Sequence, residues 1–333
     1  MTRHRLFWPL LCLAVLLVSN VFFTPSFFSV TVKQGHLYGS LIDIVRFGAP
    51  LMLVALGMTV VIATGGIDLS VGSIVAISGA LACLLISHLG DQGSLGGVLV
   101  AVVLALGLSM LLGLWNGVLV AWIGIQPIIA TLVLMVAGRG IAQLITSGQI
   151  ITINSSPYKV IGGGYLFTLP FCVYVAVAAF ALAGLVSRRT ALGMLIESVG
   201  GNAEASRLAG VRSRNLILLA YVFSGLCSGI AGLMISSNVN SADGNNAGLW
   251  IELDAILAVV LGGTALTGGR FFLAGTIVGA LTIQTLTTTI YSIGVPPEIN
   301  MVVKAGVVFV VMLLQSAEFR RAARGLIWRG AAA

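Results

Sequence analysis

The chain has 333 residues, of which 58% are apolar, 8% are charged and 42 are glycine. A soluble domain carries about 25% charged and about 45–50% apolar residues. The 10 acids and 17 bases of this chain could not cover the surface of a globule of its size in water. The composition excludes a cytosolic enzyme, a nucleic-acid-binding protein and a secreted disulfide scaffold. It indicates a polytopic membrane protein.

Apolar windows along the chain predict an all-α membrane protein of about ten transmembrane helices. Each crossing needs about 20 apolar residues, and the apolar residues of this chain suffice for nine or ten crossings. The predicted spans, in chain order, are 6–24, 44–64, 70–88, 97–121, 127–146, 169–187, 215–237, 251–267, 271–292 and 299–316. They form a single permease-like domain, 1–333, without a second soluble domain.

The basic residues orient these spans. In the ten-span arrangement both termini lie on one side of the membrane, together with twelve arginines, whereas the other side carries only Lys33 and Lys159. Loops rich in Lys and Arg stay in the cytoplasm. We therefore expect cytoplasmic N- and C-termini in the plasma (inner) membrane. The remaining three bases, Arg46, Arg139 and Lys304, fall within spans.

The longest cytoplasmic loop, 188–214, divides the chain into two halves. The unit formed by the four spans before the sixth begins outside, and the unit formed by the four spans after the loop begins inside. Two units of opposite orientation are typical of the inverted repeats of transporters. The halves share little sequence beyond the glycine breaks Gly65-Gly66 and Gly262-Gly263.

Loop 188–214 contains one predicted short helix. Asn202 is a favourable N-cap, Glu204 lies in the first turn, and Gly210 is a favourable stop. Such a helix is too polar to enter the bilayer and too short to be stable alone. It therefore needs a partner, unless the segment is only a solvated connection.

Motifs for chemistry within the chain are missing. No GxxxxGK[ST] loop precedes any of the three lysines, so the chain does not bind ATP by that route. HExxH and GxSxG are also absent, and the four cysteines lack the spacing of a metal site. We expect a transport subunit that is not itself an enzyme, with no metal and no cofactor.

Three strings resemble signatures of the ribose-type sugar permeases of ABC importers, within the branched-chain amino acid/ribose permease superfamily. Glu204-Ala205-Ser206, followed by Gly210, resembles the Glu-Ala-Ala coupling motif, with Ser206 in place of the last alanine. The strings 65–72 (GGIDLSVG) and 262–269 (GGTALTGG) resemble two further signatures. Ala137–Ile145 and Asn245–Ile256 are similar to the permeases of galactofuranose importers.

The resemblance implies a type II importer architecture and a set of partners. Glu204, Ala205, Ser206 and Gly210 would contact an ABC ATPase subunit, which would bind ATP and magnesium. A second permease, identical or paralogous, would complete the pathway. A periplasmic binding protein would deliver a monosaccharide, with galactofuranose as the implied substrate.

Polar residues in or near the spans are candidates for the substrate pathway, because side chains of this kind avoid lipid and face a bundle interior. For each single residue, however, the residue type favours a purely structural role, such as a helix cap or an ion pair, over a role in the pathway. The candidates are Asp68, Asn116, Arg139, Gln143, Asn245, Asn246, Trp250 and Gln284.

A second class of function stays open from the residues alone. In an ion-coupled secondary sugar transporter, Asp68, Glu252 and Asp254 would be the coupling acids, and the broken helices would bind the ion. None of these acids falls clearly in the middle of a span, which favours the importer interpretation.

Overall fold

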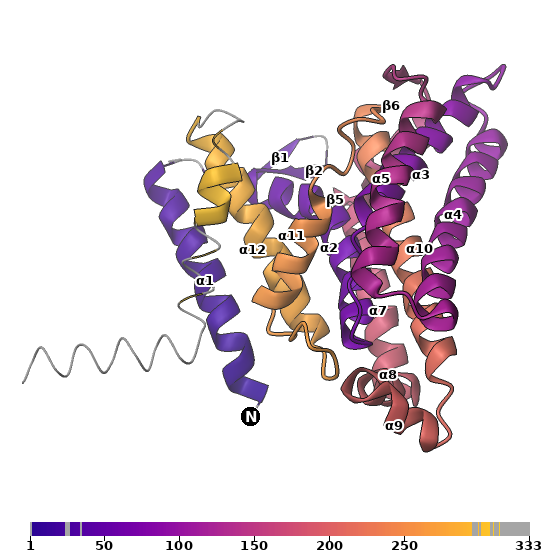
Figure 1. Cartoon of the computed structure of the whole chain (residues 1–333). Coiled ribbons are helices and arrows are strands. Elements are labelled where there is room, and N and C mark those ends of the chain that lie inside the picture. Colours follow the sequence, from indigo (N-terminus) through magenta and orange to yellow (C-terminus); the bar gives the residue numbers. More distant parts are fainter. Residues whose placement is uncertain are drawn as a thin grey trace, which may run out of the picture.

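The computed structural model describes residues 2–23, 27–33, 35–294, 299, 301–306, 309 and 313. The helices form a bundle whose long members run between two ends of the molecule (Figure 1). The helices, long and short, are α1 (Thr2–Phe23), α2 (Ser40–Ala63), α3 (Val71–Ser87), α4 (Leu95–Val118) with its π-helical continuation (Leu119–Ile123), α5 (Pro127–Ile145), α6 (Ser156–Gly163), α7 (Phe171–Arg189), α8 (Leu192–Gly201), α9 (Ala203–Leu208), α10 (Ser213–Val239), α11 (Ile251–Leu261) and α12 (Leu273–Ser292).

Six short strands form three antiparallel pairs at the end opposite α8 and α9 (Figure 1). They are β1 (Thr31–Lys33), β2 (His36–Tyr38), β3 (Ile151–Thr152), β4 (Tyr165–Leu166), β5 (Leu169–Pro170) and β6 (Ser241–Ala242). The pair β3–β6 joins the loop after α5 to the loop after α10. It therefore ties the two halves of the chain together at this end.

Six of the described helices are long and apolar enough to cross a membrane: α2, α4 with its continuation, α5, α7, α10 and α12. The apolar segments within α1 and α3 are shorter. The chain is thus a polytopic all-α protein. Helix α11 has 11 residues and ends at Leu261, short of the predicted span 251–267. Half of the predicted span 299–316 lies outside the described residues, so the count of ten stays a prediction.

One element in loop 188–214 was not predicted. The sequence analysis expects a single short helix there, but the structure has two, because α8 (Leu192–Gly201) precedes α9. Leu192, Ile196 and Val199 recur at helical spacing on α8, and Val199 is buried against the bundle. This apolar face gives α8 a reason to pack against the spans rather than stay in solvent.

Small residues let the central helices approach closely. A Cβ added at Gly113 of α4 would lie 2.4 Å from the carbonyl oxygen of Tyr221 on α10. A Cβ at Gly225 of α10 would lie 2.5 Å from the carbonyl oxygen of Ser109 on α4. A Cβ at Gly232 would lie 2.3 Å from that of Val75 on α3. Small residues at such contacts replace hydrophobic burial as the basis of helix association in lipid.

The apolar residues divide between a core and an outer surface. Helix α2 is buried over most of its length, whereas α4, α5 and α7 expose large apolar side chains. A water-soluble protein would not leave so much apolar surface exposed. The exposed faces of α4, α5 and α7 are therefore the lipid- or partner-facing surface of the bundle.

Candidate functional site

Helix α9 has the ends that the sequence predicts. The Asn202 side chain accepts a hydrogen bond from the Ala205 amide at 2.9 Å, as an N-cap does. The helix ends after Leu208, and Gly210 follows with φ of +87°. That left-handed conformation favours glycine, since a Cβ there would be strained.

The outer face of α9 is charged and apolar at once. Glu204 and Arg207 form an ion pair of 2.5 Å and are largely exposed. The hydrogen bond from Arg207 lowers the pKa of the Glu204 carboxyl. Beside them, the Leu208 side chain is 77% exposed. A single exposed leucine is common on protein surfaces and does not by itself indicate a contact. An exposed leucine next to an ion pair offers both apolar and charged groups to another protein.

Helix α9 is fastened to the bundle through its inner side. Ser206, the residue that replaces alanine in the coupling-type motif, is buried. The Ser213 hydroxyl at the start of α10 donates a hydrogen bond of 3.0 Å to the Ala203 carbonyl oxygen. Ser213 therefore links α9 to α10, and Asn202, which follows α8 and caps α9, links α9 to α8.

The end of α8 meets the end of α2 and the string 262–269 at one point. A Cβ at Gly200 would lie 1.7 Å from the Ala63 carbonyl oxygen and 2.5 Å from the Gly269 nitrogen. The Gly269 amide donates a hydrogen bond of 3.0 Å to the Ala63 carbonyl oxygen. A Cβ at Gly268 would lie 2.9 Å from the Cα of Gly65. We call these five residues, Ala63, Gly65, Gly200, Gly268 and Gly269, the glycine junction.

The glycine junction joins the segment that carries α9 to the ends of α2 and α11. The strings 65–72 and 262–269 meet at this end of the molecule through Gly65 and Gly268. Gly262 packs instead against Gly275 of α12. Backbone-to-backbone contact of this kind leaves little room for one element to move without the others.

Asp68, a predicted pathway residue, lies in a buried polar cluster between α2 and α3. Its carboxylate accepts hydrogen bonds from the Ser70 amide and hydroxyl and from the Ser224 hydroxyl. The Asn116 amide donates to the Ser70 hydroxyl at 2.8 Å. Asp68, Ser70 and Asn116 are fully buried. The cluster connects α3, α4 and α10, and a role of Asp68 or Asn116 in a substrate pathway stays a prediction.

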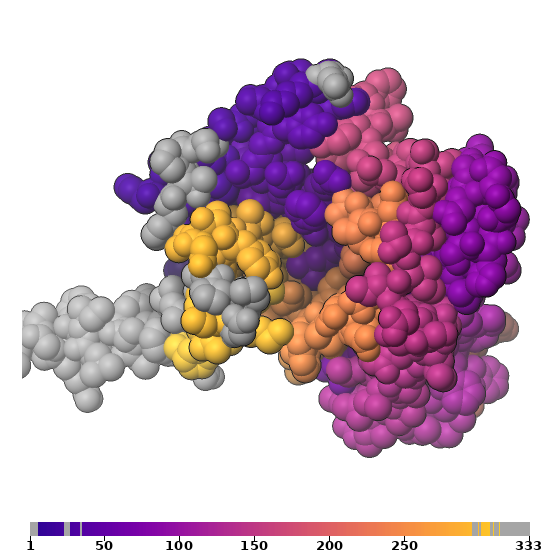
Figure 2. Space-filling model, turned by 90° about the horizontal axis from the view of Figure 1, so that it is seen from above, coloured from indigo at the N-terminus to yellow at the C-terminus, as the bar shows by residue number. Residues whose placement is uncertain are grey.

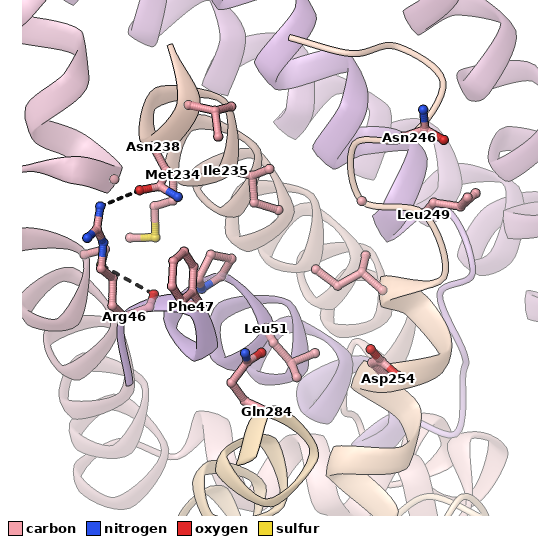
Figure 3. Close-up of a pocket in the computed structure, with 16 residues that line it drawn as sticks. Arg46, Phe47, Leu51, Met234, Ile235, Asn238, Asn246, Leu249, Asp254 and Gln284 are labelled. Atoms are coloured by element: carbon pink, nitrogen blue, oxygen red, sulfur yellow. Dashed lines mark hydrogen bonds between the residues drawn. The ribbon is translucent and has the colours of Figure 1, made fainter. Parts of the chain in front are cut away.

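At the opposite end, a cavity of about 320 Å³ lies between α2, α7, α10, α11 and α12 (Figure 3). Seen from above, the surface is hollowed between α12 and the segment before α11 (Figure 2). Arg46 donates a hydrogen bond of 2.6 Å to the Asn238 side chain across one wall. Asn246 and Leu249 lie on the facing wall, with Asp254 and Gln284 lower in the view (Figure 3).

The lining of this cavity suits a small neutral polar molecule. Amide groups of Asn238, Asn246 and Gln284 offer both donors and acceptors, and the Phe47 ring projects into the space (Figure 3). Concave sites with a largely apolar wall and a few polar groups are typical of small-molecule binding. Asp254 is paired with Lys304 at 2.5 Å, so its charge is already compensated.

The other predicted pathway residues lie at three kinds of position relative to this cavity: in its wall, at its margin, and outside it. Asn246 and Gln284 line the cavity. Arg139 is near its margin and donates a hydrogen bond of 2.6 Å to the Ala247 carbonyl oxygen, which fixes the loop that carries the asparagines. Asn245, Gln143 and Trp250 are exposed and are not among the lining residues. Trp250 has φ of +64°, which is uncommon for a non-glycine residue.

Two lining residues and one junction residue were missed by the analysis of the sequence. Arg46 is a charge inside the apolar span 44–64, and that signal alone marks it as facing the interior. Asn238 ends an apolar helix, where polar residues are common, so it carries no distinctive signal. Gly200 stands out only by its neighbour Gly201, and nothing local predicts that it meets Ala63.

A membrane bundle with an exposed short helix at one end and a polar cavity at the other is compatible with a transport permease. The family described as the branched-chain amino acid transport system permease component matches residues 40–312. The chain belongs to this family. No solved structure matches the chain.

Named relatives are sugar permeases. The chain is 49% identical to the galactofuranose transporter permease protein YtfT of Escherichia coli K12, over 97% of this chain and 95% of that protein. It is 38% identical to the fructose import permease protein FruF of Bifidobacterium longum, over 94% and 88%. It is 35% identical to the ribose import permease protein RbsC of Escherichia coli K12, over 92% of each chain.

Proposed function

We propose that this chain is the membrane-spanning permease subunit of an ATP-driven monosaccharide importer, with galactofuranose as its substrate. The single observation that carries the proposal is α9. It is an exposed, capped helix that bears the coupling-type motif and is fastened to α10 and, through α8, to the glycine junction. The identity to a galactofuranose permease over nearly the whole chain supports the choice of sugar.

In the proposed complex, a separate ATPase subunit binds ATP and magnesium and holds the face of α9 formed by Glu204, Ala205 and Leu208. A second permease subunit completes the pathway, and a periplasmic binding protein docks near the outer cavity and releases the sugar. The chain lies in the inner membrane with both termini in the cytoplasm. The end of α1 at which the chain begins lies at the same end as α8 and α9, which supports this orientation (Figure 1).

Transport then follows from alternating access. ATP-driven closure of the ATPase subunits moves α9, the glycine junction passes the movement to the ends of α2 and α11, and the outer cavity opens. Hydrolysis resets the arrangement. The amides of Asn238, Asn246 and Gln284 hold a neutral polyol by hydrogen bonds, so no titratable group has to change its charge.

Two of the three predicted coupling acids, Asp68 and Asp254, are engaged with partners, which argues against a role for these two in ion coupling. Asp68 is held by three hydrogen bonds from Ser70 and Ser224, and Asp254 is paired with Lys304. A coupling acid must exchange its ion with solvent during each cycle, and these two carboxylates are committed to partners. Glu252, the third predicted coupling acid, is buried, and its Oε2 has no hydrogen-bond partner among the described residues, so this residue keeps ion coupling open as the alternative.

The test is uptake of radiolabelled sugar and ATP hydrolysis in vesicles that hold the complete complex. Glu204→Arg reverses the charge on the exposed face of α9, and Gly210→Asp strains its end. We expect both variants to insert normally but to lose ATPase binding and ATP-dependent uptake. Ser198→Ala, a change at an exposed position of α8, is the matched control and should transport normally.

The two functions give opposite results when the ion gradients are collapsed. An importer continues uptake as long as ATP is present. Uptake that follows the gradients and is indifferent to Glu204→Arg would overturn the proposal and leave α9 as a connecting helix.

A further inference from the structure

Two adjoining cavities flank the end of α7 that leads into α8. The first, of about 330 Å³, lies between α7 and α10 and is closed by α8. Its wall includes Leu182 and Val186 of α7, Leu192 and Ile196 of α8, and Phe223 and Leu226 of α10. The second, of about 560 Å³, lies between α7 and α12. The two share Ser187, Gly193, Phe271 and Leu273 in their walls.

The cavity between α7 and α10 is chemically unlike the sugar-sized cavity at the other end. Its few polar side chains are small, and the Ser187 hydroxyl already donates to the Gly184 carbonyl oxygen at 3.2 Å. Water does not occupy a cavity of this apolar character. An empty cavity of this size would weaken the packing around it. Its position between two membrane-crossing helices makes hydrocarbon the available occupant.

Two exposed basic residues follow the wall of this cavity in the sequence. Arg188 and Arg189 end α7, directly after Ser187 of the cavity wall. Both are exposed, and neither forms an ion pair with another residue in the described part of the chain. Arg207, in contrast, is neutralised by Glu204. Basic side chains at the cytoplasmic face attract anionic lipid headgroups.

The second cavity does not provide the same site. Glu197 of α8 lines it together with Arg188, and its carboxylate would repel a phosphate inside that cavity. The headgroup is therefore restricted to the outer side of Arg188 and Arg189, and the apolar chain to the space between α7 and α10.

We propose that an anionic phospholipid binds here, with one acyl chain in the cavity between α7 and α10 and its phosphate at Arg188 and Arg189. The acyl chain then packs against Leu192 and Ile196 in the cavity wall, and so holds α8 in place. Because Gly200, in the last turn of α8, belongs to the glycine junction, the lipid stabilises the segment that carries α9. The binding itself does not depend on the proposed transport function.

The test measures lipid retention on the purified permease by native mass spectrometry, with phosphatidylglycerol and phosphatidylcholine of equal chain length as probes. The double variant Arg188→Gln/Arg189→Gln is expected to bind phosphatidylglycerol about 30-fold more weakly. Each basic side chain near an anionic lipid contributes about 1 kcal/mol, which is about fivefold in affinity. Arg212→Gln/Arg214→Gln, an equal loss of charge at the start of α10, should leave retention unchanged.

A second variant tests the apolar part. Ala183→Phe places a ring into the cavity wall without a change of charge, and it should reduce retention of both lipids. Size-exclusion chromatography of each variant confirms that the protein is folded. Equal binding of the two lipids, or wild-type retention by the Arg188/Arg189 variant, would overturn the proposal. So would disulfide cross-linking of two chains through Leu182→Cys, because a second copy would then cover the cavity.

Discussion

The two ends of the bundle are held together by different kinds of contact. At the end with α8 and α9, the glycine junction brings backbone against backbone, and a Cβ at Gly200 would overlap the Ala63 carbonyl group. At the other end, the strand pair β3–β6 also joins backbone to backbone, but in the wall of the cavity of about 320 Å³ a hydrogen bond between the side chains of Arg46 and Asn238 joins α2 to α10. A contact between backbones transmits displacement, whereas a contact between flexible side chains can open to admit a molecule.

The largest effect is expected at the glycine junction. Gly200→Ala would place a Cβ 1.7 Å from the Ala63 carbonyl oxygen, so α8 must shift away from α2. We expect the free energy of unfolding to fall by about 3 kcal/mol, at the upper end of the range for overpacking. Denaturant titration of the detergent-solubilised protein measures this change.

The neighbouring glycine is the matched control. A Cβ at Gly201 would have no neighbour within 4 Å. Gly201→Ala should therefore change the free energy of unfolding by no more than about 0.5 kcal/mol, as for surface substitutions in general. Equal destabilisation by the two alanines would show that the glycine junction is not a steric contact.

A smaller effect is expected at the outer cavity. Arg46→Gln removes the donor of the 2.6 Å hydrogen bond to Asn238, and Asn238→Ala removes the acceptor. A hydrogen bond to a charged group contributes about 1.5–3 kcal/mol. In a double-mutant cycle on the free energy of unfolding, we expect a coupling of about 1.5 kcal/mol between these two substitutions.

The control cycle combines Arg46→Gln with Asn245→Ala. Asn245 is exposed and does not line the cavity, so its effect should add to that of Arg46→Gln within about 0.5 kcal/mol. Additivity of Arg46→Gln and Asn238→Ala would mean that the hydrogen bond between them does not stabilise this end.

The difference between the two ends also explains what could be predicted from the sequence. Local signals sufficed for α9, because Asn202 and Gly210 act on the adjacent turn. Apolar windows located α2, α3, α4, α5, α7, α10 and α12 to within a few residues at each end. Sequence similarity to sugar permeases indicated the family, which the comparisons confirm.

Contacts between distant segments could not be read in the same way. The meeting of Gly200 with Ala63 and Gly269 joins three parts of the chain, and no pattern within any of them specifies the others. The cavity has the same difficulty, since Arg46, Asn238 and Gln284 come from α2, α10 and α12. Residue type predicted that Gln284 avoids lipid, but only the packing of three helices places it in the same cavity as Arg46.

A further contrast separates glycines that are needed for conformation from those that are not. Gly210 has φ of +87°, so alanine there is strained by about 1 kcal/mol although the site is open. Gly140 lies within α5, also with no neighbour for a Cβ, and alanine there should stabilise the helix by up to about 1 kcal/mol. Hydrogen exchange of α9 and α5 should therefore change in opposite directions. If Gly210→Ala left the hydrogen-exchange protection of α9 equal to that of the wild type, a conformational role of Gly210 would be excluded.

The smallest effect is expected for the Glu204–Arg207 ion pair, which is exposed to solvent. The hydrogen bond from Arg207 lowers the pKa of Glu204 in the folded protein. Its stabilisation is therefore present above the carboxyl pKa of the unfolded chain, about 4.3, and is lost as the pH falls through the lower folded value. Hydrogen-exchange protection of the α9 amides should decline over that acid range in the wild type. Glu204→Gln, which cannot titrate, should show no such decline, and the same decline in both proteins would assign it to another group.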